Sequence, residues 1–141
     1  PTLGAAPTAY HIAIRHRNHL GIMTAQAVDV GPVPFELDLT DGSVPLSGAE
    51  PTLVLGSRHL MWSGNAIGDT ALKYTGQDND RDAILQVIGG VVPSATVTGY
   101  LNADVNLDGR VKYVGVSNDR DPVLLHVGGS VPTAVRQEQL P

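Results

Sequence analysis

The N-terminal part of the chain alternates apolar and polar residues with a period of two, which is typical of β-strands. In the segment YHIAIRHR, for example, Tyr10, Ile12 and Ile14 fall on one face of the expected strand. Further short apolar runs follow, separated by turns that contain glycine and proline. We therefore expect residues 1–63 to form a small antiparallel sheet domain, whose apolar face needs a second layer of structure to cover it.

The C-terminal part, residues 64–141, contains an internal repeat. Residues 73–95 align with residues 112–134 at an offset of 39, and 13 of the 23 aligned positions are identical. The shared residues include Lys-Tyr, Asn-Asp-Arg-Asp, Gly-Gly and a proline. Identity at this level indicates a duplicated structural unit.

Each copy carries the signals of one short helix. In the second copy, Asp121 is one candidate for the N-cap, Pro122 is the first helical residue, and Gly128 ends the helix after an apolar stripe of Val123, Leu124 and Val127. In the first copy the equivalent segment runs from Asp82 to Gly89. Helices this short are not stable alone in water, so we expect their apolar stripes to pack on each other or on the sheet.

The segment before the second helix has the spacing of a calcium-binding loop. Asp104, Asn106 and Asp108 alternate, and Gly109 permits the sharp turn that follows them. The carbonyl oxygen of Arg110 is the expected fourth ligand. Because Ca²⁺ prefers hard oxygen ligands in such a loop, the sequence predicts a Ca²⁺ site here.

The spacing does not determine which residue supplies the last ligand of this site. Such a loop normally ends in a carboxylate at its twelfth position, but that position is Gly115 here. Closure therefore falls to Asp119 or Asp121 at the start of the helix. We prefer Asp121, and the other carboxylate is then free to cap the helix.

The corresponding loop of the first copy is a degraded version of the same pattern. Ile67 stands where the second copy has Asn106, and an isoleucine cannot donate an oxygen to calcium. We expect at most a weaker second site in this copy. Its candidate ligands are Asn65, Asp69, Asp80 and Asp82.

Other chemistry is less well supported. The aspartates are also consistent with an ordinary turn, because Asp and Asn tolerate unusual backbone angles, but the Asn-Asp-Arg-Asp block kept in both copies favours calcium. His16 and His19 do not predict a zinc site, since residues three apart on a strand point to opposite faces. No nucleophile elbow, phosphate loop or Ser-His-Asp pattern occurs, so we do not expect an enzyme.

Composition narrows the class of protein further. The chain has 141 residues, a formal net charge of −5 and no cysteine. Without a cluster of Lys and Arg, nucleic acid is an unsuitable partner. Without cysteine, neither a disulfide framework nor a thiolate zinc site is available. No apolar run approaches the roughly 20 residues that span a bilayer.

The paired units of loop and short helix resemble the duplicated calcium repeats of dockerins. The segments IRHRNHLGIMT, KYTG with NDRD, DVNLDG and PTAVRQEQLP more closely resemble the C-terminal region of secreted Bacteroidota surface proteins with dockerin-like repeats. The resemblance covers Tyr10 to Pro141 and implies a secreted, calcium-stabilised, non-catalytic module at the cell surface. The residues by which dockerins recognise cohesin have no clear counterpart, so cohesin binding is not implied.

The resemblance also shapes the expected assembly. Members of this family carry further strands before the RHRNHL segment, whereas this chain begins only about ten residues earlier. We therefore expect a mainly β fold, with a small immunoglobulin-like antiparallel β-sandwich whose open edge accepts a strand from another copy, followed by the dockerin-like repeats. The proline-rich N-terminal arm is the candidate donor. Head-to-tail donation builds a fibre unless it closes into a ring.

Two functions follow from these expectations. The first is a structural protein that self-assembles into a surface appendage or fibril. The alternative is a C-terminal binding or anchoring module of a larger secreted adhesin or enzyme. In addition, Asp69-Thr70-Ala71 is similar to the O-glycosylation signal of secreted Bacteroidota proteins, which makes Thr70 a candidate glycan site.

Overall fold

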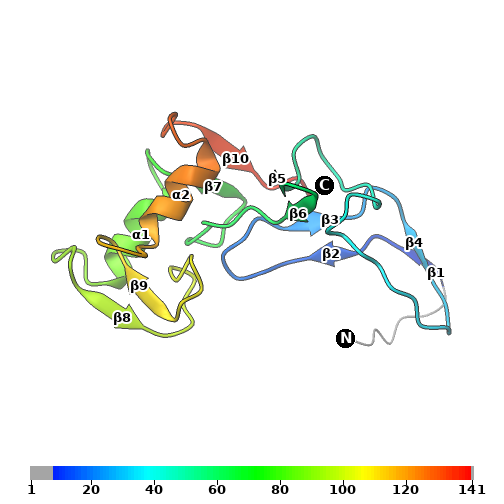
Figure 1. Ribbon diagram of the computed structural model, residues 1–141, viewed down its shortest axis with the longest axis horizontal. Coiled ribbons are helices and arrows are strands. Elements are labelled where there is room, and N and C mark those ends of the chain that lie inside the picture. Colours follow the sequence, from blue (N-terminus) through cyan, green and yellow to red (C-terminus); the bar gives the residue numbers. More distant parts are fainter. Residues whose placement is uncertain (1–7, 141) are drawn as a thin grey trace. The chain divides into compact units, whose positions relative to one another are not determined.

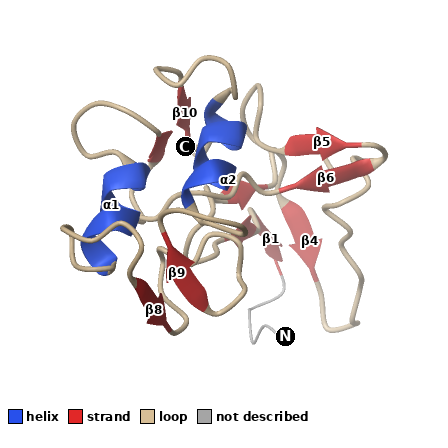
Figure 2. Ribbon diagram, turned by 60° about the vertical axis from the view of Figure 1, so that its left-hand side comes forward, coloured by secondary structure: helices blue, strands red, loops and turns tan. Residues whose placement is uncertain are grey.

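The strands of the protein are short and pair in twos (Figures 1 and 2). The structure is a computed structural model that describes residues 8–140, so most of the expected N-terminal arm lies outside the described residues. Within that range there are five antiparallel sheets of two strands each and two helices. The fold is therefore β-rich, as the sequence predicts, but several small sheets stand in place of one larger sheet.

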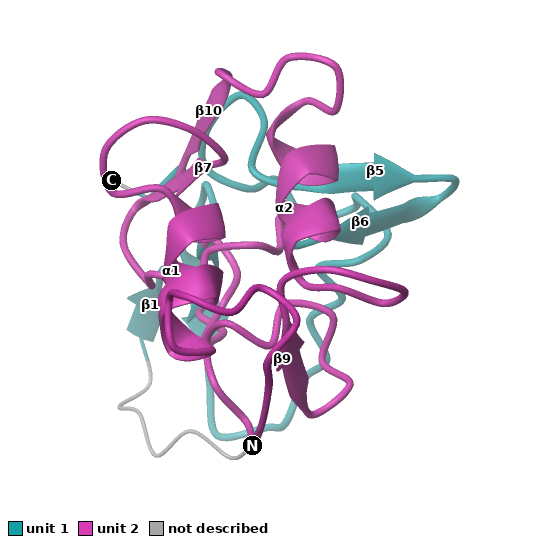
Figure 3. Ribbon diagram, turned by 90° about the vertical axis from the view of Figure 1, so that its left-hand side faces the viewer, with its two compact units in different colours: residues 1–14, 21–61, 139–141 teal, residues 15–20, 62–138 magenta. Residues whose placement is uncertain are grey.

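The chain divides into two compact units (Figure 3). The first comprises residues 1–14, 21–61 and 139–141, and the second comprises residues 15–20 and 62–138. The expected division at residue 63 did not place the RHRNHL segment, residues 15–20, with the repeats. Main-chain hydrogen bonds explain the placement, because Leu20 N donates to Trp62 O at 2.9 Å and Gly64 N donates to Asn18 O at 3.0 Å.

The first unit is built from three ribbons and has little core of its own. Strand β1 (Thr8–Tyr10) pairs with β4 (Val28–Val30), β2 (Ala13–Ile14) with β3 (Ile22–Met23), and β5 (Leu53–Leu55) with β6 (Arg58–Leu60). The expected strand through YHIAIRHR is interrupted after Tyr10, and FELDLT at residues 35–40, one of the later apolar runs expected to be a strand, is not a strand. Among the described residues of this unit, Ile22 alone is a buried hydrophobic side chain, whereas Val54 and Leu55 are exposed.

The second unit contains most of the hydrophobic core. Strand β7 (Ala71–Lys73) pairs with β10 (Val135–Gln137), and β8 (Thr96–Thr98) pairs with β9 (Arg110–Lys112). Helices α1 (Asp80–Val87) and α2 (Arg120–Val127) contact each other. Four of the six apolar positions predicted for the helices are buried, namely Ile84, Ile88, Val123 and Val127, together with Leu72 of β7 and Val111 of β9. The other two predicted positions, Leu85 and Leu124, are only half-buried.

Both helices begin earlier than the sequence predicts. Asn79 Oδ1 accepts a hydrogen bond from Asp82 N, and Asn118 Oδ1 accepts one from Asp121 N, each at 2.9 Å. In return, each asparagine Nδ2 donates to a carboxylate oxygen of its aspartate at 2.8 Å. The prediction of Asp121 as an N-cap is therefore wrong: the side chain of an upstream asparagine accepts from the first turn, and the aspartate lies inside that turn, where it accepts from the amide of the same asparagine.

Candidate metal site in the second repeat

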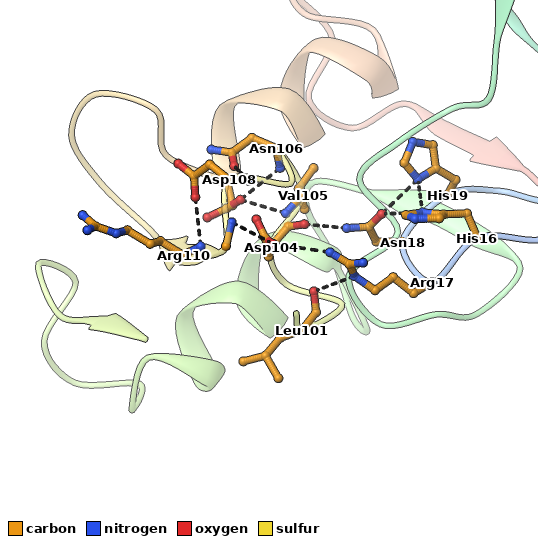
Figure 4. Close-up of polar contacts among 12 residues, drawn as sticks. His16, Arg17, Asn18, His19, Leu101, Asp104, Val105, Asn106, Asp108 and Arg110 are labelled. Carbon is orange, nitrogen blue, oxygen red and sulfur yellow. Dashed lines mark hydrogen bonds and ion pairs between the residues drawn. The ribbon is translucent and has the colours of Figure 1, made fainter. Parts of the chain in front are cut away.

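The loop over residues 104–110 is held by its own side chains (Figure 4). Asn106 Oδ1 accepts a hydrogen bond from Asp108 N, and Asp108 Oδ1 accepts one from Arg110 N, each at 2.9 Å. Asp104 Oδ2 accepts from Gly109 N at 3.2 Å. Gly109 has a φ of 83°, a conformation that favours glycine. These bonds gather three of the predicted ligands, Asp104, Asn106 and Asp108, in one tight loop.

Asp104 is the buried centre of this loop. Its Oδ2 also receives Nη2 of Arg17 at 3.3 Å, and the aspartate side chain is 0% exposed. Its Oδ1 is buried and has no hydrogen-bond partner, the one such side-chain nitrogen or oxygen in the part of the chain that the structure describes. A buried acceptor without a partner costs about 1–3 kcal/mol, and more when it is charged. A cation bound to Oδ1 would remove that cost, whereas an ordinary turn without a cation leaves the oxygen unpaired.

Asp119 connects the loop to the strand that follows it. Its Oδ1 accepts from Val105 N at 2.7 Å and Asn106 N at 3.1 Å, and its Oδ2 accepts from Lys112 N at 2.8 Å. Burial raises the pKa of this carboxyl, while the three N–H donors act in the opposite direction. Since each carboxylate oxygen accepts about two hydrogen bonds, Asp119 keeps its acceptor capacity on Oδ2.

Asp121 is not joined to the loop in this way. Its carboxylate bonds to Asn118 and Arg120, and 61% of its side chain is exposed. The Asn118 amide holds the pKa of Asp121 below its usual value. Asp121 does face Asn106 and Asp108 across an open hollow of about 500 Å³, which neither Asp104 nor Asp119 lines. Of the two closing candidates, the geometry connects Asp119, not the preferred Asp121, to the buried part of the loop.

The first loop is closed by an asparagine in place of the aspartate. Asn65 Oδ1 accepts from Gly68 N at 2.8 Å and Asp69 N at 3.1 Å, and its Nδ2 donates to Asp69 O at 2.6 Å. Both polar atoms of this side chain are therefore used within the loop. Asp69 accepts from Ala71 N at 2.8 Å.

The carboxylates after the first loop support the fold. Asp80 accepts from Ile67 N and Lys73 N, as Asp119 accepts from Asn106 N and Lys112 N. Burial raises the pKa of Asp80 to about 6. Asp82 belongs to the cap of α1, where the Asn79 amide lowers its pKa. The four residues of the weaker candidate site thus act as loop and helix-cap partners, and Thr70 is exposed beside them.

The residues that the loop pattern did not reveal come from the RHRNHL segment. Arg17 contacts the Asp104 carboxylate, and Asn18 Nδ2 donates to Asp104 O at 2.6 Å. No spacing in the sequence signals this contact, because 86 residues separate Asn18 from Asp104. The polar and charged composition of the segment was the available hint.

His16 and His19 contact each other, contrary to the prediction. Their Nδ1 atoms lie 2.8 Å apart, and the rings meet edge to face. The segment turns at this point, with His19 N bonded to His16 O, so the two side chains are not on opposite faces of a strand. Burial, with His16 nearby, lowers the pKa of His19 to about 4.

The acidic and histidine side chains limit which ligands a metal ion could find at the loop. In residues 8–140, no three side chains of His, Cys, Asp or Glu are grouped closely enough to hold a metal ion. A cation at the loop therefore needs the Asn106 amide and main-chain oxygens, as calcium loops generally do.

None of the described helices has the length and apolar character needed to cross a membrane.

Comparison with known proteins does not assign the chain to a family. No family model matches it, and no curated protein or solved structure shows significant similarity to it. The resemblance to dockerin-like repeats therefore remains a prediction that depends on the sequence motifs.

Proposed function

We propose that this chain is a non-catalytic, extracellular module whose dockerin-like second repeat is stabilised by one Ca²⁺. The observation that carries the proposal is the buried Asp104 Oδ1, which has no hydrogen-bond partner. The side-chain oxygens of Asn106 and Asp108 and the Arg110 carbonyl are the further candidate ligands, while Asp119 supports the loop through its main-chain hydrogen bonds. A set made only of oxygen atoms suits Ca²⁺ better than a transition metal.

In this proposal the ion contributes stability, and no reaction takes place at the site. A cation that binds only the folded protein stabilises it by mass action, by about 2.7 kcal/mol at a free concentration 100 times the Kd. Extracellular calcium modules bind with a Kd of about 10⁻⁴–10⁻³ M, and we expect this range here. The ion offsets the negative charge of the loop, which the Arg17 guanidinium only partly neutralises.

Isothermal titration calorimetry and thermal unfolding test this proposal. We expect one calcium site, and a melting temperature that rises with added Ca²⁺ and falls with EGTA. Mg²⁺ should have little effect, because it demands a stricter octahedral geometry. Asp108→Ala should remove most of the response, whereas Asp69→Ala, the matched change in the first loop, should preserve it. A melting temperature indifferent to both Ca²⁺ and EGTA would refute the calcium site.

A second proposal concerns the first unit, and its carrying observation is different. We propose that copies of the chain assemble by strand addition to this unit. Its ribbons have only two strands, and Phe35, Val54 and Leu55 are 49%, 57% and 67% exposed. A strand from another copy would pair with a free ribbon edge and cover apolar surface, completing an immunoglobulin-like sandwich. The alternative occupant is another domain of a larger secreted protein, for which this chain is the anchoring module.

Electron microscopy and sedimentation velocity distinguish self-assembly of this chain from binding of another domain. Regular filaments or a concentration-dependent series of oligomers support assembly of this chain with itself. Replacing Val54 and Leu55 together by lysine should then disperse the assemblies, because charged side chains oppose edge-to-edge pairing. Monomers at all concentrations would contradict self-assembly and favour the anchoring module.

A further inference from the structure

One residue of the RHRNHL segment contacts the start of both repeat loops. The carbonyl oxygen of Asn18 accepts from Gly64 N at 3.0 Å and Asn65 N at 3.1 Å, where the first loop begins. Its side-chain Nδ2 donates to the carbonyl oxygen of Asp104 at 2.6 Å, where the second loop begins. Asn65 and Asp104 are equivalent positions of the repeat. Asn18 therefore bridges the first residues of two equivalent loops. Figure 4 shows the contact that joins it to Asp104.

The bridge is itself held firmly. Asn18 is fully buried, and its Oδ1 lies 3.1 Å from His16 Nδ1 and 2.9 Å from His19 Nδ1. These contacts fix the orientation of the amide, so that Nδ2 faces Asp104. The neighbouring Arg17 contacts the Asp104 carboxylate and also donates through Nε to Leu101 O at 3.2 Å.

We propose that Asn18 is a positioning residue of the cation site, and that through it calcium at the second loop stabilises the first. This inference rests on the calcium function proposed above. Residues that orient a metal ligand without touching the metal commonly matter for affinity, because they hold the ligand in its binding position. Asn18 does so through the main chain of Asp104. Since linkage is reciprocal, an ion that holds Asp104 in place also favours the docked Asn18, whose carbonyl holds Gly64 and Asn65.

The first test is the calcium affinity of Asn18→Asp in the full chain. This change keeps the size and the Oδ1 acceptor but places an oxygen against Asp104 O in place of a donor. We expect a Kd for Ca²⁺ about 10-fold weaker or more. Asn79→Asp is the matched control, because Asn79 is also buried and its Nδ2 also donates to a main-chain carbonyl, that of Gly76 at 2.6 Å. The control should lose stability with an unchanged calcium affinity.

The second test is hydrogen exchange, residue by residue, with Ca²⁺ and with EGTA. In the wild-type chain, calcium should slow exchange at Gly109 in the second loop and also at Gly64 and Asn65 in the first. Gly90, whose N donates to Leu85 O at the end of α1, reports overall stabilisation and should slow less. In Asn18→Asp at saturating calcium, Gly109 should still slow, while the extra protection of Gly64 and Asn65 should disappear.

The outcomes separate this inference from the function on which it rests. If Gly109 responds to calcium in the wild-type chain but Gly64 and Asn65 slow no more than Gly90, the coupling is wrong and the calcium site stands. Unchanged affinity in Asn18→Asp would likewise overturn the role of Asn18 alone. If neither the melting temperature nor the hydrogen exchange of the wild-type chain responds to calcium, both proposals fail. The wild-type exchange experiment decides the coupling even if Asn18→Asp does not fold.

Discussion

Asn65 and Asp104 occupy the same position in two copies of one loop, but their side chains form different hydrogen bonds. Asn65 uses both of its polar atoms within its own loop, whereas Asp104 leaves Oδ1 buried without a partner. The surrounding framework is the same in both copies, because Asp80 and Asp119 bond equivalent main-chain N–H groups. The duplication has therefore kept the support of the loop and changed the residue at its first position.

Asp104→Asn should make the second loop resemble the first. An asparagine can donate to the Asp108 carbonyl, as Asn65 donates to the Asp69 carbonyl. We expect a melting temperature that no longer depends on calcium and that at least equals the wild-type value in EGTA. Asp104→Ala, by contrast, should lose about 1–3 kcal/mol under both conditions, because Gly109 N is left without its acceptor. Differential scanning fluorimetry checks both variants, and a calcium-dependent rise in Asp104→Asn would contradict the role given to Asp104.

Asn65→Asp is the reverse change. The new carboxylate cannot donate to Asp69 O, and the position is 3% exposed, so we expect the free energy of unfolding to fall by about 1–3 kcal/mol. Calcium should not restore it, because Ile67 supplies no oxygen at the third position. Urea unfolding with and without Ca²⁺ measures the effect. Recovery in calcium would show that the first loop also holds an ion.

Arg17→Gln should increase the affinity for calcium and lower the stability of the calcium-free protein. The guanidinium lies beside the Asp104 carboxylate, where it repels a divalent cation and neutralises the carboxylate in its absence. We expect a lower Kd for Ca²⁺ together with a lower melting temperature in EGTA. Arg110→Gln is the control, since it removes the same charge from an exposed side chain of the loop. Weaker binding by Arg17→Gln would show that Arg17 mainly orients Asp104.

The half-buried His19 should make the protein sensitive to mild acid. The unfolded chain takes up a proton at His19 near the ordinary pKa of 6.5, whereas the folded chain does so only near 4. The unfolded state therefore binds more protons between these values, and stability falls as the pH drops, by at most about 1.4 kcal/mol per pH unit for one group. His19→Asn should flatten this slope in urea unfolding experiments between pH 7 and 4.

Asp80 acts in the opposite direction over part of the same range. Its folded-state pKa is raised to about 6, so the folded protein takes up this proton first and gains stability as the pH falls toward the ordinary value of 3.8. The wild-type curve contains both effects, which is why the difference between His19→Asn and wild type is the informative measurement. An identical pH dependence in the two proteins would exclude His19 as the acid-sensitive group.

Features that depend on near neighbours in the sequence were predicted well. The apolar spacing of each repeat identified the buried faces of α1 and α2, including Ile84 and Val123. The alternation of Asp104, Asn106 and Asp108 identified a loop in which these three side chains accept hydrogen bonds from main-chain N–H groups two to five residues away. The helix starts were misplaced because asparagine and aspartate offer the same capping oxygen.

Features that depend on distant contacts were not predicted. The short strands of the first unit pair as separate ribbons, and an alternating pattern specifies a strand face without specifying how many strands pair. His16 and His19 were placed on opposite faces, since the turn between them is stabilised by packing against the repeats and not by a local turn signal. The bonds that Asp119 accepts from Val105 N and Asn106 N, 14 and 13 residues away, were likewise not indicated by the spacing of the loop.

The amino-acid sequence by itself determined the duplication, the two helices and the local hydrogen bonding of the loop, because a residue type and its close neighbours set caps, turns and amphipathic faces. Only the tertiary structure decided that the RHRNHL segment belongs to the repeats. The bond from Asn18 to Asp104 joins residues 86 positions apart, and such a bond forms only when packing brings both to the same place. Burial of Asp104 arises in the same way, and burial is what turns one aspartate oxygen into a candidate ligand.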